Sequence, residues 1–134
     1  MSRGSFFLSD ELGDYVFAHN SPEDSVLAAL AAETAAMPEA MMQSGREVGL
    51  LLQVLTRLGG ATNAIEVGTF TGYSALVVAE ALPADGRLIA CDVSAEWTAI
   101  GRRYWLDAGV AERIDLHLRP AIETLDELLA GGGR

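Results

Sequence analysis

The sequence predicts an α/β fold in which N-terminal helices precede three parallel strands. Two changes of pattern carry this prediction. In the front part of the chain, apolar residues recur at steps of three and four, as in amphipathic helices. After Gly60 the pattern becomes short β-favouring runs that alternate with helical segments, which is typical of a parallel sheet with right-handed crossovers. The order expected after residue 60 is βαβαβα.

The composition indicates one globular domain, because half of the 134 residues are apolar although the net charge is −10. The scattered arginines form no basic stripe, so we expect no nucleic-acid partner. The longest uncharged stretch, Val67–Ala79, is too short to cross a bilayer, so we expect no membrane partner. Met1–Asp10 lacks a signal-peptide pattern, and the lone Cys91 can form no internal disulfide. These observations favour a cytoplasmic location.

Three helices are expected in the front part of the chain. The first spans Asp10–His19. The second has Ser21 as its N-cap and Pro22 at its first helical position, and it runs to about Glu33. The third spans Arg46–Leu58, where the apolar residues keep a helical period until a pair of glycines stops the pattern.

Three strands are expected, at Ala64–Val67, Arg87–Cys91 and Ile114–Leu118. Each strand leads into a helix. The first of these helices begins at Tyr73 after a glycine-bearing loop, the second follows Ser94 as its N-cap, and the third begins at Pro120.

The apolar spacing of the last two helices predicts which side chains face the core. Trp97 and Tyr104 lie seven residues apart on one helix face, and we expect both in the core. Ile122, Leu125 and Leu129 are expected to point inward from the final helix.

The loop between the first strand and its helix is the first candidate for chemistry. Gly68 allows a positive φ and a close approach by a ligand, and Gly72 allows tight entry into the helix. A dinucleotide fingerprint would have closer glycines where Phe70 and Thr71 stand, and Glu66 would repel a phosphate. A positively charged ligand therefore fits the loop better. The alternative is a plain strand-to-helix turn with a buried or solvated Glu66.

Asp92 is the second candidate, because it ends the second strand 24 residues after Gly68. At a spacing of about 20 residues, an acid accepts hydrogen bonds from ribose hydroxyls in nucleotide-binding folds. An ionised carboxylate has only acceptors, which suits a diol with two donors. The alternative role of Asp92 is a helix cap near Ser94. Together, Glu66 and Asp92 favour an adenosine attached to a cation, as in S-adenosylmethionine.

Several segments together resemble one enzyme family, the cation-dependent O-methyltransferases of the caffeoyl-CoA and catechol type, particularly their bacterial members. These segments are Met42-Gln43-Ser44, Glu66 to Ser74, Leu82 to Gly86, Asp92, Ala108-Gly109-Val110 and Pro120-Ala121. The resemblance spans nearly the whole chain. It implies that residues 61–134 form the first half of a Rossmann-like S-adenosylmethionine-binding domain. It also implies that residues 1–60 form a helical segment for lid or dimer contacts.

The resemblance implies a cofactor site for S-adenosylmethionine. Its expected residues are Met42, Ser44, Glu66, Gly68, Thr69, Phe70, Ser74, Asp92 and Ala121. Within this set, Asp92 matches the acid that binds the ribose and Ala121 matches a position that lines the adenine. Met42 matches part of a lid over the methionine half, where a flexible thioether suits an irregular surface.

The resemblance also implies a divalent cation of the Mg type. In the family this ion orients a catechol-like acceptor and lowers the pKa of the hydroxyl that receives the methyl group. Its ligands lie on strands beyond the position that matches Arg134, so we expect no catalytic or metal-binding residue in this chain.

If the chain ends at Arg134, the strand Ala64–Gly68 becomes a free sheet edge, which favours a homo-oligomer, namely a dimer. The alternative is that these residues are one part of a longer enzyme.

Three functions remain open. The first is an S-adenosylmethionine-dependent O-methyltransferase with a small hydroxyl acceptor. The second is a non-catalytic remnant that binds the cofactor or dimerises. Both predict adenosyl binding through Asp92, but only the first predicts metal-stimulated methyl transfer. The third, a nicotinamide oxidoreductase, needs a phosphate-binding glycine loop and is disfavoured by Glu66 and Phe70.

Overall fold

A computed structural model describes residues 9–132 of the chain. The first eight residues, where no signal peptide was expected, and the last two residues lie outside the described part. The elements in chain order are α1 (Asp10–His19), α2 (Ser25–Ala35), η1 (Ala40–Met42), α3 (Arg46–Leu58), β1 (Asn63–Val67), α4 (Tyr73–Ala81), β2 (Arg87–Asp92), α5 (Ala95–Asp107), η2 (Ala111–Arg113), β3 (Ile114–Leu118) and α6 (Ala121–Ala130).

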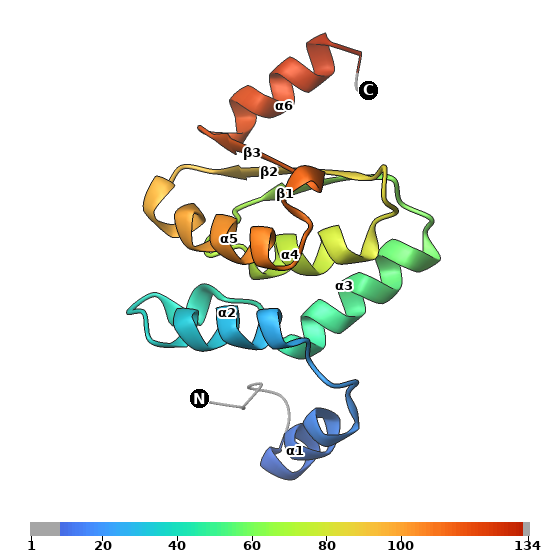
Figure 1. Ribbon diagram of the computed structural model, residues 1–134, viewed down its shortest axis with the longest axis vertical. Helices are drawn as coiled ribbons and strands as arrows, with labels where there is room; N and C mark the ends of the chain where they lie inside the picture. The colour runs from blue at the N-terminus through green and yellow to red at the C-terminus, as the bar shows by residue number, and fades with distance from the viewer. Residues whose placement is uncertain (1–8, 133–134) are drawn as a thin grey trace.

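The strands form one parallel sheet in the order β1-β2-β3, which confirms the predicted fold class. Ile65 of β1 pairs with Ile89 of β2, and Ile89 pairs with Asp115 of β3. Figure 1 shows α4 and α5 on one face of the sheet and α6 on the other. The helices α2 and α3 form a further layer beneath α4 and α5, and α1 lies apart at the bottom of the view.

The core lies between the sheet and the helices α4 and α5. Helix α4 is apolar on several sides because it is packed between the sheet and the layer formed by α2 and α3. Leu76 of α4, Leu88 of β2 and Leu30 of α2 are fully buried and belong to one apolar cluster. No helix within residues 9–132 has the length and apolar character needed to cross a bilayer.

The structure contradicts the predicted start of α2 and confirms the predicted start of α5. Helix α2 begins at Ser25 and not at Pro22, so the predicted N-cap Ser21 is wrong. The side chain of Asp24 accepts a hydrogen bond from the backbone N–H of Val26 at 2.8 Å and so caps the helix instead. The cap predicted at Ser94 is confirmed, because its hydroxyl accepts from the N–H of Trp97 at 3.2 Å.

Three residues of α6 were expected to point into the core, and this prediction is wrong for two of them. Ile122 and Leu129 are 63% and 76% exposed, and the buried residue of this helix is Thr124. Arg119, just after β3, donates to the hydroxyl of Thr124 at 2.9 Å and pairs with Glu127. These polar contacts orient α6 on the sheet, and its apolar side chains at both ends remain uncovered within the described part.

The aromatic residue of α5 that is buried in the core is not one of the two that were predicted. Trp97 and Tyr104 are only partly buried, whereas Trp105 is 2% exposed. The indole N–H of Trp105 donates to the carbonyl of Gly72 at 3.1 Å, which joins α5 to the start of α4. Packing between α5 and α4 therefore centres on Trp105, the residue next to the predicted Tyr104.

We expect Gly72→Ala to destabilise the protein more than Gly109→Ala. Both glycines have a positive φ, 83° and 71°, where alanine costs about 1–2 kcal/mol. A Cβ at Gly72 would also lie 2.7 Å from Cζ2 of Trp105, whereas a Cβ at Gly109 meets nothing within 4 Å. Overpacking should add about 1–3 kcal/mol at Gly72. Urea unfolding of both variants and the parent checks this prediction, and equal losses would contradict it.

Candidate functional site

The candidate site lies at the carboxyl ends of β1 and β2, which meet at one edge of the sheet because the strands are parallel. Val67 pairs with Cys91, and the N–H of Gly68 donates to the carbonyl of Cys91 at 2.9 Å. The pairing therefore continues to the first residue of the glycine loop. This continuation places the loop directly beside Asp92, the last residue of β2.

The carboxylate of Asp92 holds the glycine loop. Its Oδ2 accepts hydrogen bonds from the backbone N–H groups of Thr69 at 2.9 Å and Phe70 at 2.8 Å. Its Oδ1 accepts from the N–H of Ser94 at 2.8 Å. Hydrogen bonds from backbone N–H groups to an ionised carboxylate are about twice as strong as neutral ones. Asp92 therefore fixes both the loop after β1 and the approach to α5.

Phe70 adopts a left-handed backbone conformation with a φ of 51°, which is uncommon for a residue other than glycine. Such a conformation costs about 1–2 kcal/mol. Two contacts compensate for it, the hydrogen bond to Asp92 and an edge-to-face contact with the Trp97 ring at 5.2 Å between centroids. The strained turn is stable only in this tertiary setting.

Gly68 provides room beside the loop. Its φ is 85°, which strongly favours glycine. A Cβ built at this position would meet nothing within 4 Å. Glycine is therefore required here for the backbone conformation, and the space next to it is open to a ligand.

Glu66 is a partly buried acid with one buried, unsatisfied oxygen. Its Oε1 accepts a hydrogen bond from the hydroxyl of Ser74, while its Oε2 is buried and has no hydrogen-bond partner. Burial raises the pKa of Glu66 to about 7; the Asp92 charge adds to this rise, and hydrogen bonds from Ser74 and Thr69 oppose it. A buried carboxylate oxygen without a donor is costly, so the site is suited to a ligand that brings a donor or a positive charge.

The structure places six of the nine predicted site residues around the loop after β1 and the other three on other segments of the chain. Glu66, Gly68, Thr69, Phe70, Ser74 and Asp92 form the cluster described above. Met42 lies half-exposed in η1, Ser44 lies between η1 and α3, and Ala121 begins α6. No hydrogen bond or ion pair among the described residues joins these three to the cluster.

One contact between the helical layer and the loop was not predicted. The hydroxyls of Thr34 in α2 and Thr71 in the loop are 2.8 Å apart, and both residues are fully buried. The residues are 37 positions apart, so no local sequence pattern could have indicated this contact. It places the end of α2 against the loop. The segment after α2 lies on the same left-hand side of Figure 1 as the carboxyl ends of the strands.

A divalent cation does not fit the residues present. Across residues 9–132, no group of three or more His, Cys, Asp or Glu residues is placed to hold a metal ion. We therefore assign no metal-dependent step to the described part of the chain.

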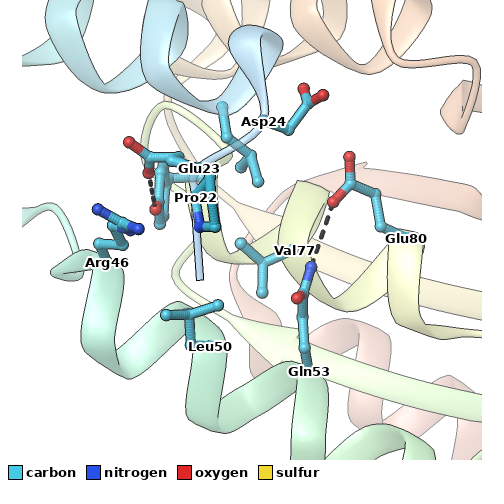
Figure 2. A pocket seen from close by; sticks show the side chains of 11 residues that line it. Pro22, Glu23, Asp24, Arg46, Leu50, Gln53, Val77 and Glu80 are labelled. Carbon is cyan, nitrogen blue, oxygen red and sulfur yellow. Dashed lines mark hydrogen bonds between the residues drawn. The ribbon is translucent and has the colours of Figure 1, made fainter. Parts of the chain in front are cut away.

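A separate cavity of about 110 Å³ lies between α2, α3 and α4. Figure 2 shows Arg46 and Glu23 on one side of it and Asp24 and Glu80 on the other. Gln53 donates to Glu80 at 3.2 Å across this region. The cavity contains none of the predicted site residues. Two of its acids have partners in the lining, because Tyr73 donates to Glu23 and Gln53 donates to Glu80, and we treat it as a packing cavity.

A profile of the O-methyltransferase family matches residues 17–133. The chain belongs to this family. The family resemblance predicted from the sequence is therefore confirmed. Catechol O-methyltransferase domain-containing protein 1 of Mus musculus is 44% identical over 121 residues, which cover 90% of this chain and 46% of the relative. Caffeoyl-CoA O-methyltransferase 1 of Arabidopsis thaliana is 37% identical over 128 residues, which cover 94% of this chain and 49% of the relative.

Solved structures of O-methyltransferases share the fold of this family member. The O-methyltransferase from Bacillus cereus in complex with SAH has a TM-score of 0.81 and 27% identity, over 90% of this chain and 55% of that chain. TomG from Streptomyces achromogenes, in complex with SAM, has a TM-score of 0.78 and 30% identity, over 88% of this chain and 53% of that chain. The chain thus spans about half the length of the relatives it matches.

We expect the free energy of unfolding to decrease as the pH rises from about 5 to 8, because folding keeps Glu66 in a site that disfavours its charge. The pKa of Glu66 is about 7 in the folded protein, above the ordinary glutamate value of 4.5, so the folded state holds the proton more tightly. This stabilisation, about 3 kcal/mol, is complete below pH 4.5 and is lost as the pH passes through 7.

Glu66→Gln should remove this part of the pH dependence, because glutamine stays neutral. Glu96→Gln, at an exposed position in the first turn of α5, is the matched control and should keep the slope of the parent. Urea unfolding at several pH values measures the effect. The same slope in Glu66→Gln and the parent would contradict the assignment.

Proposed function

We propose that the chain binds S-adenosylmethionine as the methyl donor of an O-methyltransferase. The observation that carries this proposal is the buried Glu66 oxygen without a donor, next to the open space at Gly68 and close to Asp92. A cationic ligand with hydroxyl groups satisfies both acids at once. The proposal is supported by relatives of the same fold that were solved with SAH or SAM.

The proposed cofactor lies along the carboxyl ends of β1 and β2. Asp92 accepts from the ribose, Glu66 faces the positively charged methionine half, and Ser74 shares a hydrogen bond with Glu66. Gly68, Thr69 and Phe70 provide the backbone against which the ligand packs. We further propose that Met42 and Ser44 approach from the helical layer and that Ala121 lines the adenine.

When bound, the cofactor would supply its sulfonium methyl group to an acceptor oxygen; the bond between the methyl carbon and sulfur would break, and S-adenosylhomocysteine would leave. The described residues contribute binding and electrostatics to this reaction. Glu66 in its ionised form stabilises the cationic ligand, and the loop held by Asp92 orients it. No described side chain is assigned to removing the proton of the acceptor, so we assign no catalytic residue.

The acceptor and the domain organisation are also proposals. The names of the relatives favour a small catechol-like hydroxyl acceptor. A Mg-type cation is proposed only on the family resemblance of the sequence, and residues outside the described part would hold it. We propose that residues 61–134 form the first half of the cofactor-binding domain and that residues 1–60 form the helical segment. The free buried thiol of Cys91 agrees with a cytoplasmic location.

We expect the protein to bind SAH and not NAD. The acid at the mouth of the loop opposes a pyrophosphate, and it favours the ammonium group of the methionine half. Isothermal titration calorimetry with both ligands measures this preference. Binding of NAD with the affinity of SAH, or failure of SAH to bind, would refute the cofactor assignment.

Binding of S-adenosylmethionine should release a proton near neutral pH. The ligand's positive charge favours ionised Glu66 and so lowers its pKa from about 7. We therefore expect affinity to rise as the pH increases from 6 to 8 in the parent, and to stay nearly constant in Glu66→Gln. Titrations in buffers with different ionisation enthalpies measure the released proton directly. An equal pH dependence in both proteins would show that Glu66 does not face the charge.

We also propose that the chain forms a homodimer through β1 and α3. Ile65 and Val67 on β1, with Leu51, Leu55 and Leu58 on α3, are exposed large apolar residues. β1 pairs only with β2 in the described part, so its other edge has free backbone groups. An edge strand and an apolar helix face close together favour association.

Ile65→Lys should weaken this association, because it places a charge on the apolar edge strand. Leu106→Lys, which adds the same charge at an exposed apolar position of α5, is the matched control and should leave the association unchanged. Sedimentation velocity at micromolar concentration measures the oligomeric state of the parent and of both variants. A monomeric parent would contradict the proposed dimer.

A further inference from the structure

The hydroxyl groups of Thr34 and Thr71 form a hydrogen bond whose direction is set by a third group. A threonine hydroxyl has one proton to donate. Thr34 donates its proton to the carbonyl of Leu30 at 2.9 Å, one turn earlier in α2. The proton between the two hydroxyls, which are 2.8 Å apart, therefore belongs to Thr71, and Thr34 accepts it. Within residues 9–132 the Thr71 hydroxyl has no other hydrogen-bond partner.

The two threonines depend on this bond to different degrees. Both are fully buried, so water does not replace a lost partner. Without the Thr34 hydroxyl, the Thr71 hydroxyl would be buried without an acceptor. Without the Thr71 hydroxyl, Thr34 would still donate to Leu30. The glycine loop therefore depends on α2 more than α2 depends on the loop.

Thr71 is the residue through which the helical layer contacts the glycine loop. Its two neighbours in the chain both have a positive φ, 51° and 83°. Such an irregular backbone persists only where the surrounding structure holds it. Asp92 accepts from the N–H groups before Thr71, and Trp105 donates to the carbonyl of the residue after it. Thr34 holds the side chain between these two anchors.

We propose that Thr34 is a positioning residue for the cofactor site and acts through Thr71. This inference rests on the proposed function, because it needs the adenosyl ligand to pack against the glycine loop. Thr34 is fully buried in α2, so it does not touch the ligand itself. Its bond keeps the loop in the ligand-binding conformation before the ligand arrives, and such preorganisation lowers the cost of binding. The helical layer thus contributes to cofactor affinity.

Calorimetry measures the SAH affinity of the parent and of variants of Thr34. Thr34→Val keeps the shape of the side chain without the hydroxyl, and we expect it to bind SAH about tenfold more weakly. Thr34→Ser keeps the hydroxyl and should bind within about threefold of the parent. Tyr104→Phe is the matched control, because it removes another hydroxyl bond at the end of α2, the one to Glu33 at 2.6 Å. Its SAH affinity should stay within about twofold of the parent.

Thr71→Val and the double variant show whether Thr34 acts through Thr71. Both substitutions remove the same bond, so the double variant should bind SAH no more weakly than the weaker of the two single variants. Thr71→Val also decides the question if Thr34→Val does not fold, since Thr34 keeps its bond to Leu30 in that variant. We expect Thr71→Val to weaken SAH binding by about threefold or more.

Thermal melting shows which variants are folded at the temperature of the titration. An unchanged SAH affinity in folded Thr34→Val or Thr71→Val would overturn the inference, and so would equal weakening in Thr34→Ser. Equal weakening in Tyr104→Phe would show a general effect of α2 packing and would also overturn it. If the two single effects multiply in the double variant, the residues act separately and the inference is wrong. No binding of SAH to the parent would instead refute the proposed function.

Discussion

The arrangement of the candidate site depends on the hydrogen bonds of a single carboxylate, that of Asp92. It joins three segments that the chain order separates, namely the end of β2, the loop after β1 and the approach to α5. Without it, two buried N–H groups of the loop lose their acceptor, and the left-handed turn at Phe70 loses its main compensation. A residue predicted to bind a ligand is thus also the residue that holds the loop in shape.

Glu66, the second acid of the site, differs from Asp92 in how its oxygens are hydrogen-bonded. Asp92 is satisfied by backbone donors, whereas Glu66 is partly buried, with one oxygen unpaired and a pKa near neutrality. In the absence of a ligand this burial makes the charged form unfavourable, so the protein gives up stability at neutral pH. A ligand cation reverses that penalty. Asp92 therefore holds the loop in place, whereas the pKa of Glu66 is sensitive to a nearby charge. Both residues were nevertheless predicted from the same kind of observation, an acid at the end of a strand.

The sequence was sufficient for most of the helices and strands, but not for contacts between distant segments. The helical period of α3 predicted its bounds correctly, and the change of period after Gly60 predicted the three parallel strands. Periodicity identifies an apolar face without showing what covers it, which is why Ile122 and Leu129 were wrongly expected to be buried. The start of α2 was wrong because two cap residues competed and Asp24 made the hydrogen bond. The loop bonds to Asp92 involve backbone N–H groups, which carry no residue-specific signal.

The candidate site lies at the end of β1, and the positions of the helices on the two faces of the sheet explain why. Helices α4 and α5 cover one face while the strands advance from β1 to β3, and α6 lies on the opposite face. Because parallel crossovers are right-handed, a parallel strand joined through α6 has to lie in the opposite direction, beside the free edge of β1. Strand order would then reverse at β1, and in open α/β sheets ligands bind outside the carboxyl ends of strands at such a reversal. Glu66 and Gly68, at the end of β1, are the candidate residues nearest to this point. Such a strand and the proposed homodimer would use the same edge of β1, so they are alternatives, and in either case Glu66 and Gly68 lie where that edge strand ends.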